Sequence, residues 1–187
     1  MEILVVIAVL SLVGAMVVVI FTRSLQGSTK SQILLAIKQN GQAVLETMDK
    51  TVRGADSVVC VSNLSNPTIV TVRDGFYTRY RFIEPTAGNN GRILQDTPVP
   101  PSSPGPGDLE LFLDNVCTSA LTGANTLTDT NQQTGVSIDS SSFTKDQLAG
   151  FKDKITIKLV LKPGVEAPAV LAGQIDPVTF QTTIELR

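Results

Sequence analysis

Few side chains in this sequence could perform covalent catalysis or hold a metal. The chain has 187 residues, no histidine and two cysteines, Cys60 and Cys117. Without histidine, the nucleophilic schemes that pair it with serine or cysteine are excluded, and two cysteines alone cannot complete an ordinary structural zinc site. No G-x-x-x-x-G-K-[ST] stretch occurs, so the chain has no phosphate-binding loop of that kind. We expect a protein that is not an enzyme and holds no metal or cofactor.

Two polar motifs remain as weaker candidates for a site. The stretch Asp129–Gly135, DTNQQTG, carries oxygen-bearing side chains on alternate residues, as calcium loops do. It lacks the later bidentate glutamate and its glycine is out of place, which favours a polar turn. Asn63-Leu64-Ser65 matches the N-glycosylation sequon, a match that is common by chance.

Aromatic and arginine side chains alternate along Tyr77–Phe82, as they do in some proteins that bind single-stranded nucleic acid. The simpler interpretation is a strand with one core face and one solvated face. Charge supports it: residues 1–53 carry five Lys/Arg and three acids, whereas residues 54–187 carry ten and fourteen. A nucleic-acid binder needs a basic footprint, so no nucleic-acid partner is expected for this acidic region.

The two cysteines suit a disulfide if the protein is exported. Joining Cys60 to Cys117 would close a loop of 58 residues, for which the chain-entropy estimate is about 4 kcal/mol. The alternative is two buried free thiols in a cytosolic protein. The hydrophobic N-terminal segment favours export, and therefore the disulfide.

That segment, Ile3–Phe21, contains nineteen residues and no charge. As a helix it would span about 28 Å, close to the hydrocarbon thickness of a bilayer. A cleaved signal peptide usually has a basic start, a shorter apolar run and a small-residue cleavage site, none of which is seen here. The segment is therefore predicted to cross a membrane.

Glu2 stands at the edge of this uncharged span, where a carboxylate is costly to bury without a partner. A free α-amino group on a neighbouring subunit could be that partner. Alternatively, Glu2 lies in the headgroup region of an ordinary anchor. The residues alone leave both possibilities open.

The helical pattern continues beyond the span. Small or apolar residues recur every three or four positions, which indicates one helical face; they are Leu34, Ile37, Gly41, Val44, Met48 and Val52. Gly54 is a plausible C-cap. We predict one helix over residues 1–53, about 80 Å long, with a hydrophobic half at 1–22 and an amphipathic half at 23–53.

From residue 54 the pattern changes to that of a β-rich head. Predicted strands cover 57–62, 68–73, 77–83, 109–114, 155–162 and 178–187, with a hairpin at Asp74-Gly75. The proline-rich stretch 98–107 is predicted to be an irregular loop, and the polar stretch 119–147 a long, mostly irregular surface loop. The fold class is therefore α+β: a long helix whose amphipathic half packs on one face of an antiparallel sheet.

The stretch EILVVIAVLSLVGA, which opens on Glu2, strongly resembles the N-terminal signature of type IV pilins and pseudopilins. NGQAVLETMDKTVRGADSVVC resembles their junction between helix and head. The resemblance covers about the first quarter of the chain. It implies a structural subunit that polymerises into an extracellular helical filament, through a core helix whose large side chains are Ile3, Leu4, Val5, Val6, Ile7, Val9, Leu10, Leu12, Val13, Val17, Val18, Val19, Ile20 and Phe21.

The resemblance further implies that Glu2 pairs with the N-terminal amine of an adjacent subunit, here carried by Met1. The subunit would reside in the cytoplasmic membrane before assembly and at the cell surface afterwards. A prepilin peptidase, an assembly ATPase and a polytopic platform protein are the implied partners.

The sequence departs from the family in having only Met1 before Glu2, where the family has a short basic leader. Arg23 and Lys30 follow the span and nothing basic precedes it, which conflicts with the rule that positive charge stays cytoplasmic. We expect a basic leader to be encoded just upstream. Major pilin, minor pseudopilin of a secretion or DNA-uptake machine, and a non-polymerising anchored β domain that binds a ligand all remain open.

Overall fold

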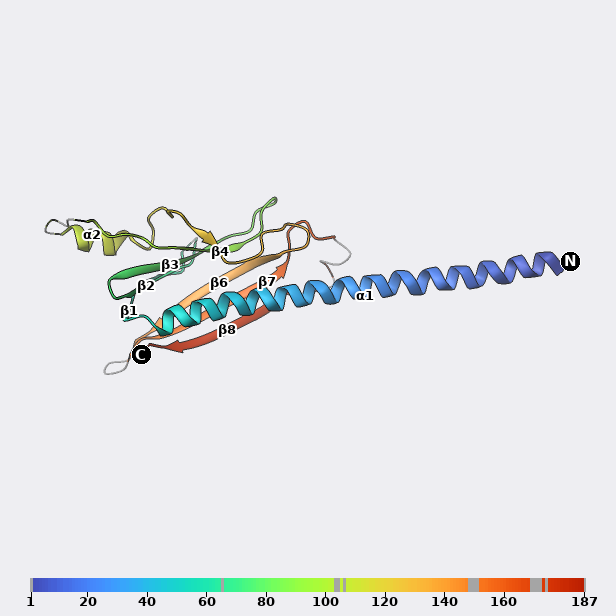
Figure 1. Ribbon diagram of the computed structural model, residues 1–187, viewed down its shortest axis with the longest axis horizontal. Coiled ribbons are helices and arrows are strands. Elements are labelled where there is room, and N and C mark those ends of the chain that lie inside the picture. The colour runs from blue at the N-terminus through green and yellow to red at the C-terminus, as the bar shows by residue number, and fades with distance from the viewer. Residues whose placement is uncertain are drawn as a thin grey trace.

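The computed structural model describes residues 2–64, 66–102, 105, 107–147, 152–168, 173 and 175–186, without the side chains of Glu2 and Leu4. It has a long helix, α1 (Glu2–Arg53), and a head of two antiparallel sheets. Figure 1 shows α1 leaving the head as a single rod that ends at the N-terminus. The predicted α+β class is consistent with this arrangement.

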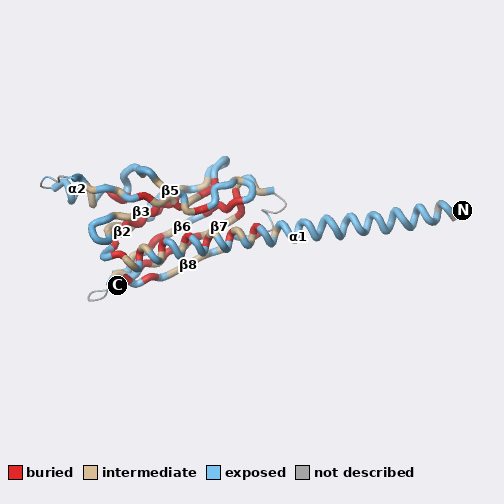
Figure 2. Tube along the Cα trace, in the orientation of Figure 1, coloured by how far each residue is buried: buried red, intermediate tan, exposed pale blue. Residues whose placement is uncertain are grey.

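The two halves of α1 have different surroundings. Figure 2 shows the N-terminal half exposed on all sides and the C-terminal half lying along the head. Ile37, Val44, Met48 and Val52 are buried against the head, as the three-and-four spacing predicts. The last helical residue is Arg53, and the N–H of Gly54 still donates to the carbonyl of Lys50 at 3.2 Å.

The first sheet has the order β1-β2-β3-β4-β5, formed by β1 (Ser57–Ser62), β2 (Thr68–Arg73), β3 (Phe76–Ile83), β4 (Arg92–Asp96) and β5 (Asn125–Thr126). The predicted hairpin at Asp74-Gly75 is confirmed. Both turn residues have positive φ, 51° and 78°, as a tight turn between twisted antiparallel strands requires. The strands predicted over 57–62, 68–73 and 77–83 correspond to β1, β2 and β3.

The second sheet has the order β6-β7-β8, formed by β6 (Val136–Asp146), β7 (Lys154–Pro163) and β8 (Val178–Glu185). The inner face of β7 and β8 contacts α1. The prediction of one sheet is therefore wrong. The segment 119–147, predicted to be a mostly irregular loop, contains β5 and the whole of the long strand β6. The sequence of β6 is polar because it contains three consecutive serines, Ser140, Ser141 and Ser142. The strand is nevertheless paired with β7 along its length.

A second correction concerns residues 109–114, which were predicted as a strand. They lie in a short helix, α2 (Asp108–Asn115), whose N-cap Gly107 has φ 94°. The left-handed conformation of Gly107 and acidic residues in the first turn favour a helix start here. α2 follows the proline-rich loop, of which residues 103, 104 and 106 lie outside the described part of the chain.

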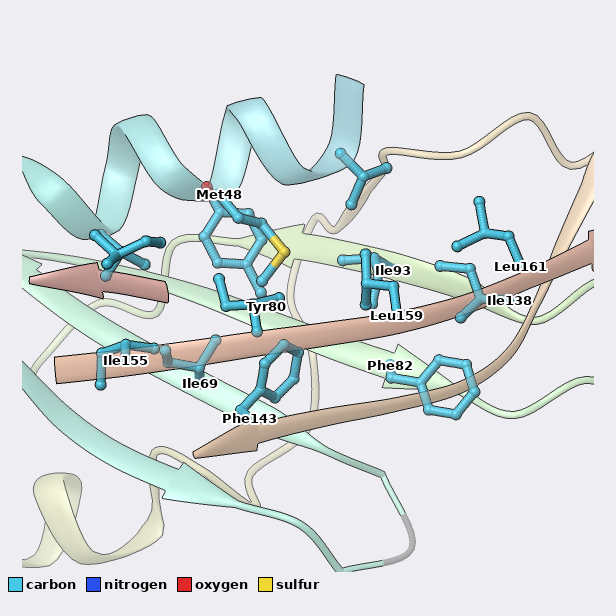
Figure 3. Packing of buried hydrophobic residues seen from close by; sticks show 14 of the residues in the cluster. Met48, Ile69, Tyr80, Phe82, Ile93, Ile138, Phe143, Ile155, Leu159 and Leu161 are labelled. Atoms are coloured by element: carbon cyan, nitrogen blue, oxygen red, sulfur yellow. The ribbon is translucent and has the colours of Figure 1, made fainter. Parts of the chain in front are cut away.

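Hydrogen bonds from β6 join the second sheet to the first sheet and its loops. The side-chain amide of Asn63 pairs with the backbone of Phe143: its Nδ2 donates to the carbonyl at 2.5 Å, and its Oδ1 accepts the N–H at 2.9 Å. The N–H of Ile138 donates to the carbonyl of Gly91 at 2.9 Å, and a Cβ at Gly91 would collide with the Ile138 carbonyl. Figure 3 shows the larger of the two hydrophobic clusters, which lies between the sheets and α1, with Met48 over Tyr80.

Candidate functional site

The N-terminal half of α1 presents a continuous apolar surface. Every large apolar side chain of the predicted core helix other than Leu4, whose side chain is not described, is between 51% and 76% exposed. Burying a large apolar side chain is worth about 1.5–3 kcal/mol relative to leaving it in water. A surface of this size on a soluble monomer is unfavourable, which marks it as the principal contact surface of the protein.

The same segment suits a membrane by length and composition. An 18-residue stretch of the helix reaches a mean hydropathy of 2.9, and none of it is buried inside the head. This is the composition of a membrane anchor or of a signal sequence.

The hydroxyl groups on this half of α1 bond to the helix itself. Ser11 Oγ donates to the carbonyl of Ile7 at 2.7 Å, and Thr22 Oγ1 donates to that of Val18 at 2.8 Å. In the amphipathic half, Thr29 and Ser31 likewise donate to the carbonyl one turn back. Since an unpaired hydroxyl is costly away from water, these bonds make the segment compatible with an environment that excludes water.

Of the two predicted pairing residues, Glu2 has its backbone at the free end of this rod. Glu2 is the first residue of α1, but its side chain lies outside the described structure, and so does Met1. The helix therefore places the backbone of Glu2 at the tip of the apolar half, far from the head.

The predicted disulfide is present. Cys60 on β1 is bonded to Cys117, with Cα atoms 6.3 Å apart. The bond ties residues 108–122, which include α2, across the face of the first sheet that points away from α1. We call this stretch the covering segment. Tyr77 meets Phe112 of the covering segment edge-on, with ring centroids 5.0 Å apart.

Arg79 and Arg81 lie beneath the covering segment, only 1% and 8% exposed. Arg79 donates to the carbonyls of Val116, Ser119 and Ala120. Arg81 Nη2 donates to the carbonyl of Cys117 at 2.6 Å, and its Nε to Thr68 Oγ1. The predicted solvated arginine face is therefore wrong, because a distant segment covers it and the two guanidinium groups bond its carbonyls.

Asp96 offsets one of these two buried positive charges by pairing with Arg79. Burial disfavours its charged form, but hydrogen bonds from Arg79 and the Thr122 backbone outweigh that penalty and hold the pKa of the Asp96 carboxyl below its usual value. Burial and the neighbouring Arg79 lower the pKa of Arg81, with Asp96 acting in the opposite direction. The arrangement is a closed structural network, and its donors are turned towards the protein's own backbone.

The calcium-like stretch is a turn, as its sequence favours. Asp129 Oδ1 accepts the N–H of Asn131, and Asn131 Oδ1 accepts those of Gln133 and Thr134, at 2.9–3.0 Å. The oxygens that would face a cation are thus used by the backbone. Within the described ranges, no three acidic or cysteine side chains are grouped to hold a metal.

The fold and surfaces together define an α+β protein with a disulfide-bonded head and an N-terminal helix of membrane-spanning length. Comparison of the chain with protein-family models, with curated proteins and with solved structures yields no match.

Proposed function

We propose that this protein is the structural subunit of an extracellular filament of the type IV pilin kind. The observation that carries the proposal is the division of α1: one uninterrupted helix packs one face on the head over its second half and is bare and apolar over its first. The resemblance of the Glu2–Ala15 stretch to the pilin signature adds independent support.

The proposed mechanism follows from keeping the apolar half of α1 out of water at every stage. Before assembly, lipid covers it; in the filament, the corresponding halves of other copies cover it. Because the hydroxyls of Ser11 and Thr22 are already bonded within the helix, the transfer from lipid to protein exposes no new unpaired hydroxyl group. A prepilin peptidase, an assembly ATPase and a platform protein would act in this process.

Glu2 would set the order of addition. A carboxylate in an apolar surrounding is costly unless it is paired, so pairing with the N-terminal amine of an adjacent copy is satisfied only at the correct stagger. The charge then acts as a selector of register, while the apolar surface supplies the attraction.

The decisive experiment compares Glu2→Gln with Glu46→Gln in the full chain expressed in its own cells. Glu46 is an exposed glutamate on the same helix with no ion pair among the described residues. We expect Glu46→Gln to give normal filaments in negative-stain images of sheared surface material. Glu2→Gln should give none while the protein stays in the membrane fraction.

Normal filaments from Glu2→Gln would contradict the pairing mechanism. A wild-type chain that remains a membrane-anchored monomer, with no filament under conditions in which it is produced, would contradict the proposal as a whole and favour an anchored β domain. Quantitative mass spectrometry of the sheared material distinguishes a major subunit from a minor pseudopilin.

A further inference from the structure

Charge is segregated between two surfaces of this chain. From residue 3 to residue 45 there is no acidic residue, and the cations are Arg23, Lys30 and Lys38. From residue 93 to residue 144 there is no lysine or arginine, and three of the acids, Asp108, Glu110 and Asp114, belong to α2.

The acidic surface lies at the end of the head farthest from the N-terminus. Figure 1 shows α2 beyond the C-terminal end of α1. All three acids of α2 are exposed, and none forms an ion pair with another described residue. Two apolar side chains stand among them, Leu109 at 45% and Leu111 at 63% exposure. We call this surface the α2 pole.

The basic surface lies where α1 leaves the head. Arg23 and Lys30 precede the buried residues Ile37 and Val44 by successive steps of seven, so all four lie on nearly the same side of the helix. That side faces the head at Ile37 and Val44, which places the two cations beneath the base of the head.

Next to them is a groove of about 550 Å³ between α1 and the loops that contain Gln133 and Glu166. Ile33 and Ala36 of α1 and Pro168 of the loops supply apolar lining. Glu166 is the acidic residue of this lining. The two cations, Arg23 and Lys30, lie on the adjoining face of the helix. This groove and the two cations form what we call the basal surface.

We propose that the α2 pole of one copy binds the basal surface of another copy farther along the filament, a different neighbour from the copy whose N-terminal amine pairs with Glu2. Leu111, which neighbours Asp114 on the helix surface, enters the apolar groove, while Glu110 and Asp114 lie opposite Arg23 and Lys30. The inference rests on the proposed function and specifies how neighbouring heads meet.

The geometry suits a polymer. The two surfaces differ and lie at opposite ends of the head. When copies bind through two different surfaces, each added copy leaves one surface free for the next, so the chain of copies grows as an open filament unless the rotation between copies closes it into a ring. The helical rise sets the scale of the step: α1 advances about 35 Å from Lys30 to Arg53 and about 45 Å from Arg23. A copy shifted outward by at least that distance places its apolar half beside the α1 of the inner copy.

Charge reversal in the full chain tests this contact. We expect Glu110→Lys with Asp114→Lys to reduce filament yield about ten-fold, and Arg23→Glu with Lys30→Glu to do the same, because like charges then face each other. Combining all four substitutions restores the opposite signs and should bring the yield back to near the wild-type level. The matched control is Lys158→Glu on the outward face of β7, an exposed lysine away from both surfaces, which should leave the yield unchanged.

Equal amounts of membrane-inserted, disulfide-bonded protein are the criterion that each variant has folded. In wild-type filaments, carbodiimide treatment should produce an amide between Lys30 of one copy and Glu110 or Asp114 of another, identified by mass spectrometry. Higher ionic strength should weaken assembly of the wild type.

Three outcomes would overturn the inference. Unchanged filaments from both double variants mean that the surfaces do not meet, although the filament proposal stands. Loss in both without rescue in the combination means that the charges act separately. Loss only with Arg23→Glu and Lys30→Glu, accompanied by a weaker membrane association, assigns the cations to anionic lipid headgroups. The absence of filaments from the wild type is a different result, since it refutes the proposed function itself.

Discussion

Arg79 and Asp96 form a two-point ion pair across the β3–β4 ladder, with Nε to Oδ1 at 2.8 Å and Nη2 to Oδ2 at 2.5 Å. Their side chains are 1% and 0% exposed. The remaining guanidinium donors bond backbone carbonyls of the covering segment, and Asp96 accepts the N–H of Thr122. The pair therefore organises the part of the covering segment that follows α2.

Replacing Asp96 by Asn should leave the Arg79 charge buried and unpaired. Removing one partner of a buried pair costs about 3–5 kcal/mol, and we expect a loss of that order in the free energy of unfolding. Urea denaturation of the detergent-solubilised full chain measures it. The control is Asp74→Asn. Asp74 Oδ2 lies 3.6 Å from Arg73 Nε with both side chains largely exposed, so this ion pair is expected to contribute less than about 1 kcal/mol to stability. Equal losses in the two variants would contradict the central role of Asp96.

The pH dependence of stability provides a separate test of Asp96. Because its pKa in the folded protein lies below the ordinary value, which is about 3.9, the unfolded state takes up a proton first as the pH falls. The stabilisation is fully present above that value and is lost as the pH falls through the lower, folded pKa. Between about pH 5 and pH 2, the wild type should lose more stability than Asp96→Asn. Parallel curves for the two proteins would disprove this assignment.

Gly41 is the point at which α1 accommodates the ring of Phe180 on β8. A Cβ at Gly41 would stand 2.6 Å from two ring carbons, so Gly41→Ala should displace the ring or the helix. We expect a destabilisation of about 1–3 kcal/mol from overpacking, measured by thermal unfolding. Gly27→Ala is the matched control, since nothing lies within 4 Å of its Cβ position and alanine favours the helix by about 1 kcal/mol. A Gly41→Ala protein as stable as Gly27→Ala would show that the contact is not tight.

The Cys60–Cys117 disulfide should stabilise the head and retain the covering segment. Replacing both cysteines by serine is expected to cost about 2–5 kcal/mol and to make residues 108–122 the first site of proteolysis. Limited proteolysis followed by mass spectrometry locates the cleavage. Reductant should produce the same cleavage in the wild type and no further change in the double-serine protein. Cleavage that begins elsewhere would show that the arginine contacts alone hold the covering segment.

Local patterns predicted the parts of the fold that depend on local chemistry. The spacing of Ile37, Val44 and Met48 indicated the buried face of α1, and Asp74-Gly75 indicated the hairpin, because each depends on residues close in sequence. The missed strand β6 has a different origin, because its sequence lacks a clear local pattern. The serines of β6 do not alternate cleanly with apolar residues, and the register shift between Ile138 and Ser140 interrupts the period of two.

The arginine face shows why the covering segment could not be predicted. Alternation along β3 correctly separates Tyr80 and Phe82 from Arg79 and Arg81, but it does not reveal which face meets solvent. That depends on residues 116–120, almost forty positions away, whose carbonyls need donors. The pairing of Asp96 with Arg79 is equally non-local, and only the predicted disulfide pointed to this part of the chain.

The position of Cys60 determines how the head responds to pulling. Cys60 follows the last residue of α1 by seven positions, and only the Ser57 and Val58 pairs of the β1–β2 ladder precede it. Tension applied along α1 therefore reaches the disulfide after at most two residue pairs of the β1–β2 ladder have separated. Beyond that point the force divides between two chain segments, and the rest of the ladder is shielded from being peeled apart one pair at a time.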